Sequence, residues 1–263
     1  MNAPEIAYYL PKETAEVCND ERMKQCKNLS LLLHKYPPQA ALQSSAHKNQ
    51  WLRTLLSNNV IDINLSMHAY RRWHAMTTAA GAQHFHAKTD WHLAQGLSNE
   101  TVLETNLTLH PLYGLPLIPG SALKGLCRNY VTGEISEHIS KNSDEDDETV
   151  RRIFGSPDQG GTVIFFDALP VEGKATFALD IINVHYPDYY NRGKAPVNDQ
   201  HPNPLLFLTV ADTIFAFALA PRNLKRAEHR DDVIVASQWL QEALQEWGIG
   251  GKTSAGYGYF TPQ

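Results

Sequence analysis

The sequence has few cysteines for its length. Only Cys18, Cys26 and Cys127 occur among 263 residues, and no two of them form a CxxC pair. An odd number of scattered cysteines argues against a disulfide scaffold, and the lack of CxxC pairs argues against a Cys-rich structural zinc site. The cysteine content therefore predicts a reduced, cytosolic environment.

The chain also lacks long apolar runs and a signal-like start. One of its most apolar stretches, residues 214–220, is far shorter than the ~20 residues that a membrane helix needs. The first residues show no basic region followed by an apolar one, as a secretory signal would. We expect no membrane partner and no export.

Positive charge is not in excess. Lys and Arg number 23 against 28 Asp and Glu, which gives a formal net charge of −5. This balance argues against a protein that coats nucleic acid by bulk charge, so any nucleic-acid site must be a local patch. Because 43% of the residues are hydrophobic, the chain can bury a sizeable core.

The first third of the chain has helical patterning. Residues 1–60 contain short apolar clusters and a Pro37-Pro38 break, which predicts short helices. From Ala69 the apolar residues recur at helical spacing until Gly81. We expect residues 1–86 to form a helical extension.

The remaining residues, 87–263, alternate strands with helices. A brief alternation near Trp91 predicts a strand, and Ser121 is a suitable N-cap for the helix that follows. Later strands are expected at 162–166, 175–182, 205–210, 213–219 and 259–260, with a helix near 236–247. The strands at 205–210 and 213–219 are expected to pair as a hairpin. This order predicts an α+β, ferredoxin-like βαββαβ core with insertions.

An acidic run interrupts this pattern. Residues 144–148 are five consecutive acids, and like-charge runs repel and stay hydrated. We expect an acidic surface insert near 140–150, with a metal site as the minor alternative.

Two familiar motifs are present only in part. A nucleotide-binding loop ending at Gly251-Lys252-Thr253 would need glycine at Glu246 and would open a helix, whereas this loop follows one. The SxxK pattern from Ser121 to Lys124 lacks the SDN and KTG strings of serine hydrolases. These comparisons argue against nucleotide hydrolysis and acyl transfer.

The histidines form only a weak metal-binding pattern. His84 and His86 are alternate residues and would lie on one side of a strand, but no third ligand follows at an obvious spacing. Ordinary packing or surface roles are therefore favoured, and metal binding stays open.

Two features favour anion binding. A helix starting near Ser121 would present free N–H groups, and Lys124 and Arg128 would extend positive charge along one face. The loop 248–258 contains five glycines together with hydroxyls and a lysine, so its backbone can approach a nucleic-acid strand closely. Tyr257 and Tyr259 could stack on bases or belong to the core.

Five segments, in order along residues 90–260, resemble the RAMP superfamily of CRISPR proteins and, within it, the family of the sixth subunit of type III-B (Cmr) effector complexes. They are residues 115–125, 153–155, 163–168, 180–190 and 248–258. The helix start LPLIPGSALKG and the glycine-rich loop are typical of the superfamily. The strings HYPDYY and IGGKTSAGYG are similar to the narrower family.

The resemblance implies a ferredoxin-like, RRM-like RAMP domain over residues 87–263. It further implies a non-catalytic subunit of a Cmr ribonucleoprotein that binds CRISPR guide RNA near its 3′ end and packs against other RAMP subunits. Target RNA would be met indirectly, in antiviral defence, with no catalytic residue, cofactor or metal. The residues implied to contact the RNA backbone are Ser121, Lys124, Arg128, Gly250, Gly251, Lys252, Thr253, Ser254, Gly256 and Tyr257.

The sequence departs from the family pattern in two places. The usual second serine of the IPGSS string is Ala122, and the GxG after the first strand reads Gly96-Leu-Ser98. Another matching segment has residues that would contact either RNA or a neighbouring subunit, namely His185, Tyr186, Tyr189 and Tyr190.

Two rival functions remain open. One is a guide-processing endoribonuclease of the same superfamily that uses a histidine, such as His185, as general acid or base. The other is a structural adaptor that contacts only proteins.

Overall fold

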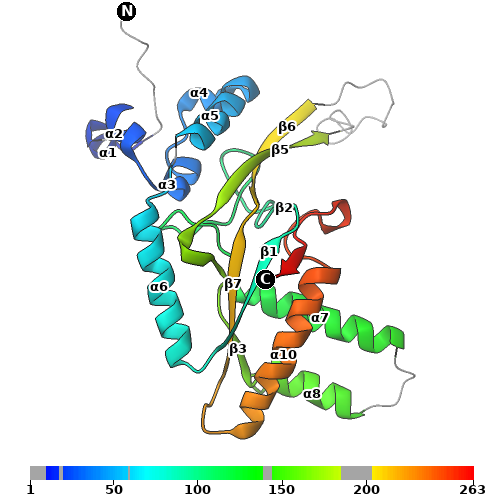
Figure 1. Cartoon of the computed structure of the whole chain (residues 1–263). Helices are drawn as coiled ribbons and strands as arrows, with labels where there is room; N and C mark the ends of the chain where they lie inside the picture. Colours follow the sequence, from blue (N-terminus) through cyan, green and yellow to red (C-terminus); the bar gives the residue numbers. More distant parts are fainter. Residues whose placement is uncertain (1–9, 18–19, 59, 139–143, 185–202) are drawn as a thin grey trace, which may run out of the picture.

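The computed structural model describes residues 10–17, 20–58, 60–138, 144–184 and 203–263. Its N-terminal part is helical, as expected (Figure 1). The short helices are α1 (Lys12–Val17), α2 (Asp20–Gln25), α3 (Leu29–His34), α4 (Gln39–Gln43) and α5 (Ser45–Ser57). A longer helix, α6 (Ile63–Ala79), follows and is capped by the Asp62 carboxylate, which accepts a hydrogen bond from the Leu65 N–H at 3.0 Å.

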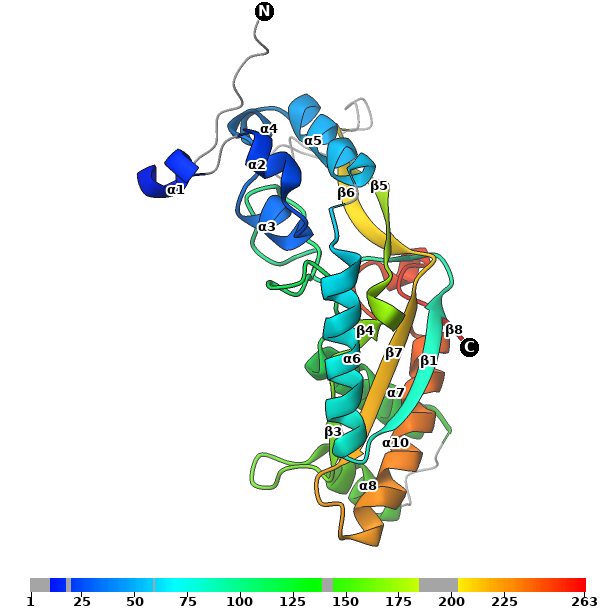
Figure 2. The ribbon, with the colours of Figure 1, turned by 60° about the vertical axis from the view of Figure 1, so that its left-hand side comes forward.

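The main sheet is antiparallel and has the strand order β3-β7-β1-β8. A further strand, β4, pairs with β7 outside this path. The bounds are β1 (Gln83–Thr89), β3 (Val163–Phe165), β4 (Leu169–Pro170), β7 (Ile214–Pro221) and β8 (Phe260–Pro262). Figure 2 shows α6 on one face of this sheet, and on the other face α7 (Gly120–His138) and α10 (Ala227–Glu246). The mixed α+β class is therefore confirmed.

The strand β7 is buried on both faces, and its side chains alternate in size. Phe215, Phe217 and Leu219 belong to the core cluster that contains residues of α7 and α10. Ala216 and Ala218 belong to the cluster around Trp73 of α6. Small residues on the second face let α6 approach the sheet closely, while the aromatic rings fill the space under α7 and α10.

A second sheet has the order β2-β6-β5, with β2 (His92–Leu93), β5 (Thr176–Val184) and β6 (Asn203–Ala211). The expected hairpin between residues 205–210 and 213–219 is wrong, because β6 pairs with β5 and β2 while β7 pairs with strands of the main sheet. Both edges of β7 are already occupied, which leaves no edge for β6. Asp212, at φ 44°, makes the turn between the two sheets.

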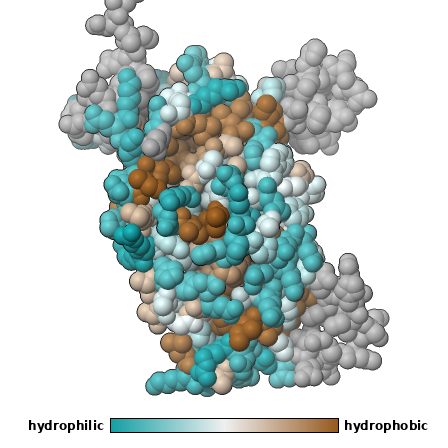
Figure 3. Space-filling model, viewed as in Figure 1, coloured by the Kyte–Doolittle hydropathy of each residue, from teal (hydrophilic) through white to brown (hydrophobic). Residues whose placement is uncertain are grey.

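The N-terminal helices join the rest of the chain through the second sheet. Leu52 and Leu55 of α5 are buried in the same cluster as Leu206 and Leu208 of β6. In Figure 3, hydrophobic residues gather on the upper part of the visible face of the molecule, where α5 meets β5 and β6. The helical extension is thus packed on the sheet rather than tethered to it.

Three sequence boundaries need correction. The main-sheet strand β1 begins at Gln83, so the expected division after residue 86 falls inside a strand. Helix α7 begins at Gly120, so Ser121 lies inside the helix, and the Asp167 carboxylate accepts from the Gly120 N–H at 2.7 Å. The acidic run 144–148 lies within α8 (Asp144–Phe154), which packs through Val150, Ile153 and Phe154.

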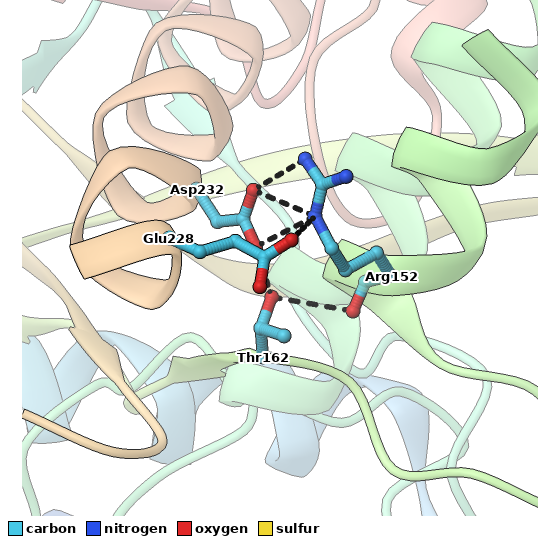
Figure 4. Close-up of polar contacts among 4 residues, drawn as sticks. All are labelled: Arg152, Thr162, Glu228 and Asp232. Atoms are coloured by element: carbon cyan, nitrogen blue, oxygen red, sulfur yellow. Dashed lines mark hydrogen bonds and ion pairs between the residues drawn. The ribbon is translucent and has the colours of Figure 1, made fainter. Parts of the chain in front are cut away.

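An ion-pair network fixes α8 to α10 and β3 (Figure 4). Arg152 donates to both carboxylate oxygens of Asp232, from Nη2 to Oδ1 at 2.9 Å and from Nε to Oδ2 at 3.2 Å. Thr162 Oγ1 donates to Asp232 Oδ2 at 2.7 Å, and Glu228 adds a longer contact with Arg152. Asp232 is only 2% exposed, so its charge depends on these partners. In the described part of the chain, no helix is long and apolar enough to cross a membrane.

We predict that Asp232→Ala lowers the free energy of unfolding by about 3 kcal/mol, because it leaves Arg152 and Thr162 without their acceptor. The control Asp231→Ala removes an exposed carboxylate from the same helix and should change stability by less than about 0.5 kcal/mol. Urea unfolding measures both. Equal effects of the two substitutions would contradict the structural role of this network.

Candidate nucleic-acid interface

The glycine-rich loop after α10 is anchored to β2 and the residue after it. The Gly251 N–H donates to the Ala94 carbonyl at 2.8 Å, and the Gly258 N–H donates to the His92 carbonyl at 2.8 Å. Gly258 has φ +77°, and a Cβ there would lie 1.9 Å from the Ile249 oxygen. No larger residue fits this position, so glycine is required where the two ends of the loop meet.

The tip of the loop is exposed. It forms the short helix η2 (Thr253–Ala255), preceded by Lys252 in the left-handed region at φ 63°. Ser254 and Gly256 are exposed. Within the described residues, the backbone N–H groups of Lys252, Thr253 and Ser254 donate to no other backbone group. The tip therefore offers N–H and hydroxyl donors of the kind that can bind an anion.

The Lys252 side chain lies against two aromatic rings. Its Nζ is 5.3 Å from the centre of the Tyr257 ring and 5.6 Å from that of Phe207. Cation–π contacts at such distances contribute about 0.5–1 kcal/mol at exposed sites. The ammonium group thus has a defined position beside the loop.

Tyr257 is buried, which favours the core position among the two roles that the sequence left open. It is 4% exposed, and its hydroxyl donates to Asp180 Oδ2 at 2.6 Å. Asp180 Oδ2 also lies 3.1 Å from Nδ1 of His92. The phenol therefore fixes the loop to β5 instead of facing a ligand, and any contribution to RNA binding is through the position of the loop.

The Asp180 carboxylate stays ionised in this environment. Burial raises its pKa, but hydrogen bonds from Tyr257 and from the Ile181 N–H, together with the nearby His92, more than offset this and lower the pKa below its ordinary value. Burial and the adjacent carboxylate raise the pKa of Tyr257. An ionised acceptor and a protonated donor form a strong, charge-assisted hydrogen bond.

The expected cationic face of α7 is present. Ser121 and Arg128 are exposed and Lys124 is half-buried, whereas Leu123 and Cys127 on the other side are buried in the core. At the helix start, however, the Asp167 carboxylate already occupies the Gly120 N–H. The positive charge of this element therefore lies on Lys124 and Arg128, while the helix terminus already faces a carboxylate.

The structure keeps the two candidate elements separate. In the described part of the chain, no hydrogen bond, ion pair or ring contact joins Lys124 or Arg128 to the loop. The other candidates, His185, Tyr186, Tyr189 and Tyr190, lie outside the described residues.

The sequence reasoning missed an aromatic residue next to the loop. Trp91 is 49% exposed, and its ring stacks on His92 at 4.7 Å between centroids and contacts Tyr257 at 4.9 Å. It stands between β1 and β2, where only a short strand was expected. Asp180 was also missed, although a carboxylate in the middle of an apolar strand is a signal that could have identified it.

His84 has a packing role. Its ring stacks on His74 at 4.8 Å, and Nε2 lies 2.7 Å from Thr77 Oγ1. Burial lowers its pKa, and the neighbouring His74 and His86 lower it further. Over the described ranges, no group of three or more potential ligands could hold a metal ion.

The chain belongs to the RAMP superfamily, because the sequence profile of this superfamily matches residues 84–261. A solved structure of a type III-B Cmr-beta complex bound to cognate target RNA contains a chain with a TM-score of 0.61. The two chains are 22% identical, and the match covers 82% of this chain and 72% of that chain. At this identity the likeness concerns the fold.

Particular relatives are more informative at the level of sequence. The Cmr6 subunit of Pyrococcus furiosus is 31% identical, with 65% of each chain covered. The Cmr6 subunit of Saccharolobus solfataricus is 27% identical over 60% of this chain and 49% of its own. The chain thus spans less than two thirds of the length of either. A third relative, the Csm3 endoribonuclease of Streptococcus thermophilus, is 25% identical over 56% of this chain and 69% of its own.

We predict that Tyr257→Phe lowers the free energy of unfolding by about 1–3 kcal/mol, since the charge-assisted bond to Asp180 is removed. Hydrogen exchange at Gly251 and Gly258 should also accelerate, because the loop loses one of its anchors. Tyr259→Phe, two residues further on, is the control. Unchanged exchange in Tyr257→Phe would contradict the anchoring role.

We predict that stability falls as the pH drops below 6.5, in part because of His84. A histidine whose pKa is lower in the folded chain than its ordinary value of 6.5 stabilises the fold above that pH, and this contribution disappears as the pH falls. His84→Gln should therefore show a smaller loss of stability between pH 7.5 and about 5 than the wild type. His68→Gln, which changes an exposed residue of α6, should retain the wild-type dependence.

Proposed function

We propose that this chain is a guide-RNA-binding subunit of a type III-B CRISPR effector complex, and that it does not cut RNA. The observation that carries the proposal is the glycine-rich loop, with its tip exposed and its ends anchored to β2. Backbone N–H groups, hydroxyls and Lys252 at the tip suit contacts with a sugar-phosphate backbone. Such contacts hold a guide whose own base pairing supplies sequence specificity.

The fold supports the same proposal. We take the order β3-β7-β1-β8, with α7 after β1 and α10 after β7, as a ferredoxin-like, RRM-like βαββαβ arrangement. Domains of this class bind single-stranded RNA and pack side by side. The partners would be CRISPR guide RNA, near its 3′ end, and other RAMP subunits of the complex, while target RNA would be met indirectly. The names of the two Cmr6 relatives favour this assignment.

Absence of catalysis is part of the proposal. Among the described residues, His92 is a histidine next to the loop, and it lies under the Trp91 ring with Nδ1 engaged by Asp180 and Thr209. Nδ1 is therefore engaged within the protein, and the His92→Ala assay tests the remaining ring nitrogen, Nε2. The net charge of −5 also suits a subunit that needs only a few phosphate contacts.

The endoribonuclease alternative is favoured by one observation, the name of the Csm3 relative. Its test is to incubate the purified chain with repeat RNA and to repeat the assay with His185→Ala and His92→Ala. Cleavage by the wild type that either substitution abolishes would replace the non-catalytic assignment. We expect no processing by any of the three proteins.

We predict that Lys252→Ala combined with Lys124→Ala and Arg128→Ala weakens RNA binding and makes it less salt-dependent. For every phosphate that is no longer neutralised, the slope of log affinity against log salt should fall by about 0.7 for a single strand. The control is Lys225→Ala, which removes an exposed charge before α10, about 30 Å from the loop along the 20-residue helix.

The readout is ultraviolet crosslinking of guide RNA to this subunit in the reconstituted complex, at several salt concentrations. A clear loss of crosslinks in the triple variant, with Lys225→Ala unaffected, is the expected result. Crosslinks that remain at the wild-type level would favour the protein-only adaptor.

A further inference from the structure

We propose that Trp91 is a stacking platform for one base of single-stranded RNA next to the glycine-rich loop. This inference rests on the proposed RNA-binding function and adds a contact of a different chemical kind. The loop and α7 offer donors and charges to phosphates, whereas an indole ring offers a π-face to a base. The feature that points to it is a large aromatic ring that is half exposed beside the exposed tip of the loop.

The Trp91 ring is supported from within the protein. It stacks on the His92 imidazole at an interplanar angle of 29°, and it contacts Tyr257 at 50°. His92 Nδ1 and the Tyr257 hydroxyl both lie within hydrogen-bond distance of Asp180 Oδ2. One carboxylate thus fixes both rings beneath the indole, so stacking on it requires little reordering of the protein.

The platform is also adjacent to the backbone donors. A Cβ built on Gly256 would lie 4.0 Å from Cε3 of Trp91, so the loop backbone passes directly beside the indole. Gly258, two residues further along, is hydrogen-bonded to the His92 carbonyl. A nucleotide whose phosphate contacts the loop tip therefore has its base within reach of the Trp91 ring.

Three other aromatic rings of the described residues are less suited to this role. Tyr257 and Phe207 are buried at 4% and 0% exposure. Trp247, at the end of α10, is 38% exposed, but its ring packs edge-on against Tyr130 and against the backbone of Gly133. Of the four rings compared, Trp91 is the most exposed.

The test separates stacking from backbone binding. The full chain is titrated, at about 50 mM salt where phosphate contacts are strong, with a fluorescent single-stranded oligouridylate and with a ribose-phosphate oligomer of the same length that has no bases. The proteins compared are the wild type, Trp91→Leu, Trp91→Phe and Lys252→Ala. Stacking contributes about fivefold or more per base, so the wild type should prefer the base-containing strand by at least that factor.

The expected outcomes differ between the variants. Trp91→Leu should lose most of the preference for bases while it still binds the abasic strand, and Trp91→Phe should keep part of the preference. Lys252→Ala should weaken binding of both strands alike. RNA should quench the tryptophan fluorescence of the wild type. This quenching should be smaller in Trp91→Phe, which keeps the other four tryptophans.

Two results would overturn the inference. If Trp91→Leu retains the wild-type preference for bases, the indole contacts something other than a base. If the wild type binds both strands equally, only the stacking inference fails, whereas binding of neither strand contradicts the proposed RNA-binding function as well.

Discussion

The burial of β7 on both faces is the constraint on which the rest of the structure depends. Its large residues, Phe215 and Phe217, face α7 and α10, while Ala216 and Ala218 face α6. Because both edges of the strand are also paired, β7 fixes the positions of the helices and of its neighbouring strands together. A polar or bulky residue on either face would disturb several elements at once.

The candidate interface is a consequence of this arrangement. Since both edges of β7 are occupied, the chain turns at Asp212 and β6 joins a separate sheet with β2 and β5. The loop after α10 then attaches to β2 through Gly258, and Asp180 of β5 holds Tyr257. The exposed tip of the loop is thus positioned by contacts with β2 and β5, which is how a rigid scaffold holds a binding loop.

Much of the fold follows from local sequence patterns, and the remainder depends on tertiary contacts. Periodicity predicted α6, α7, α10 and several strands, but it missed β1, which crosses the expected division after residue 86. It could not predict that β6 and β7 separate, since this depends on which strands occupy the edges of β7. For the site, residue type and resemblance identified the loop and the cationic face of α7. The burial of Tyr257 and the exposure of Trp91 depend on Asp180, which lies 77 residues from Tyr257 in the sequence.

The most direct test of the central claim is to purify the tagged chain from its native cells under mild salt, to sequence the RNA that accompanies it and to identify the accompanying proteins. The account predicts CRISPR guide RNAs together with other RAMP subunits. Recovery of the chain alone, without RNA, would contradict the proposal that it works as a guide-RNA-binding subunit.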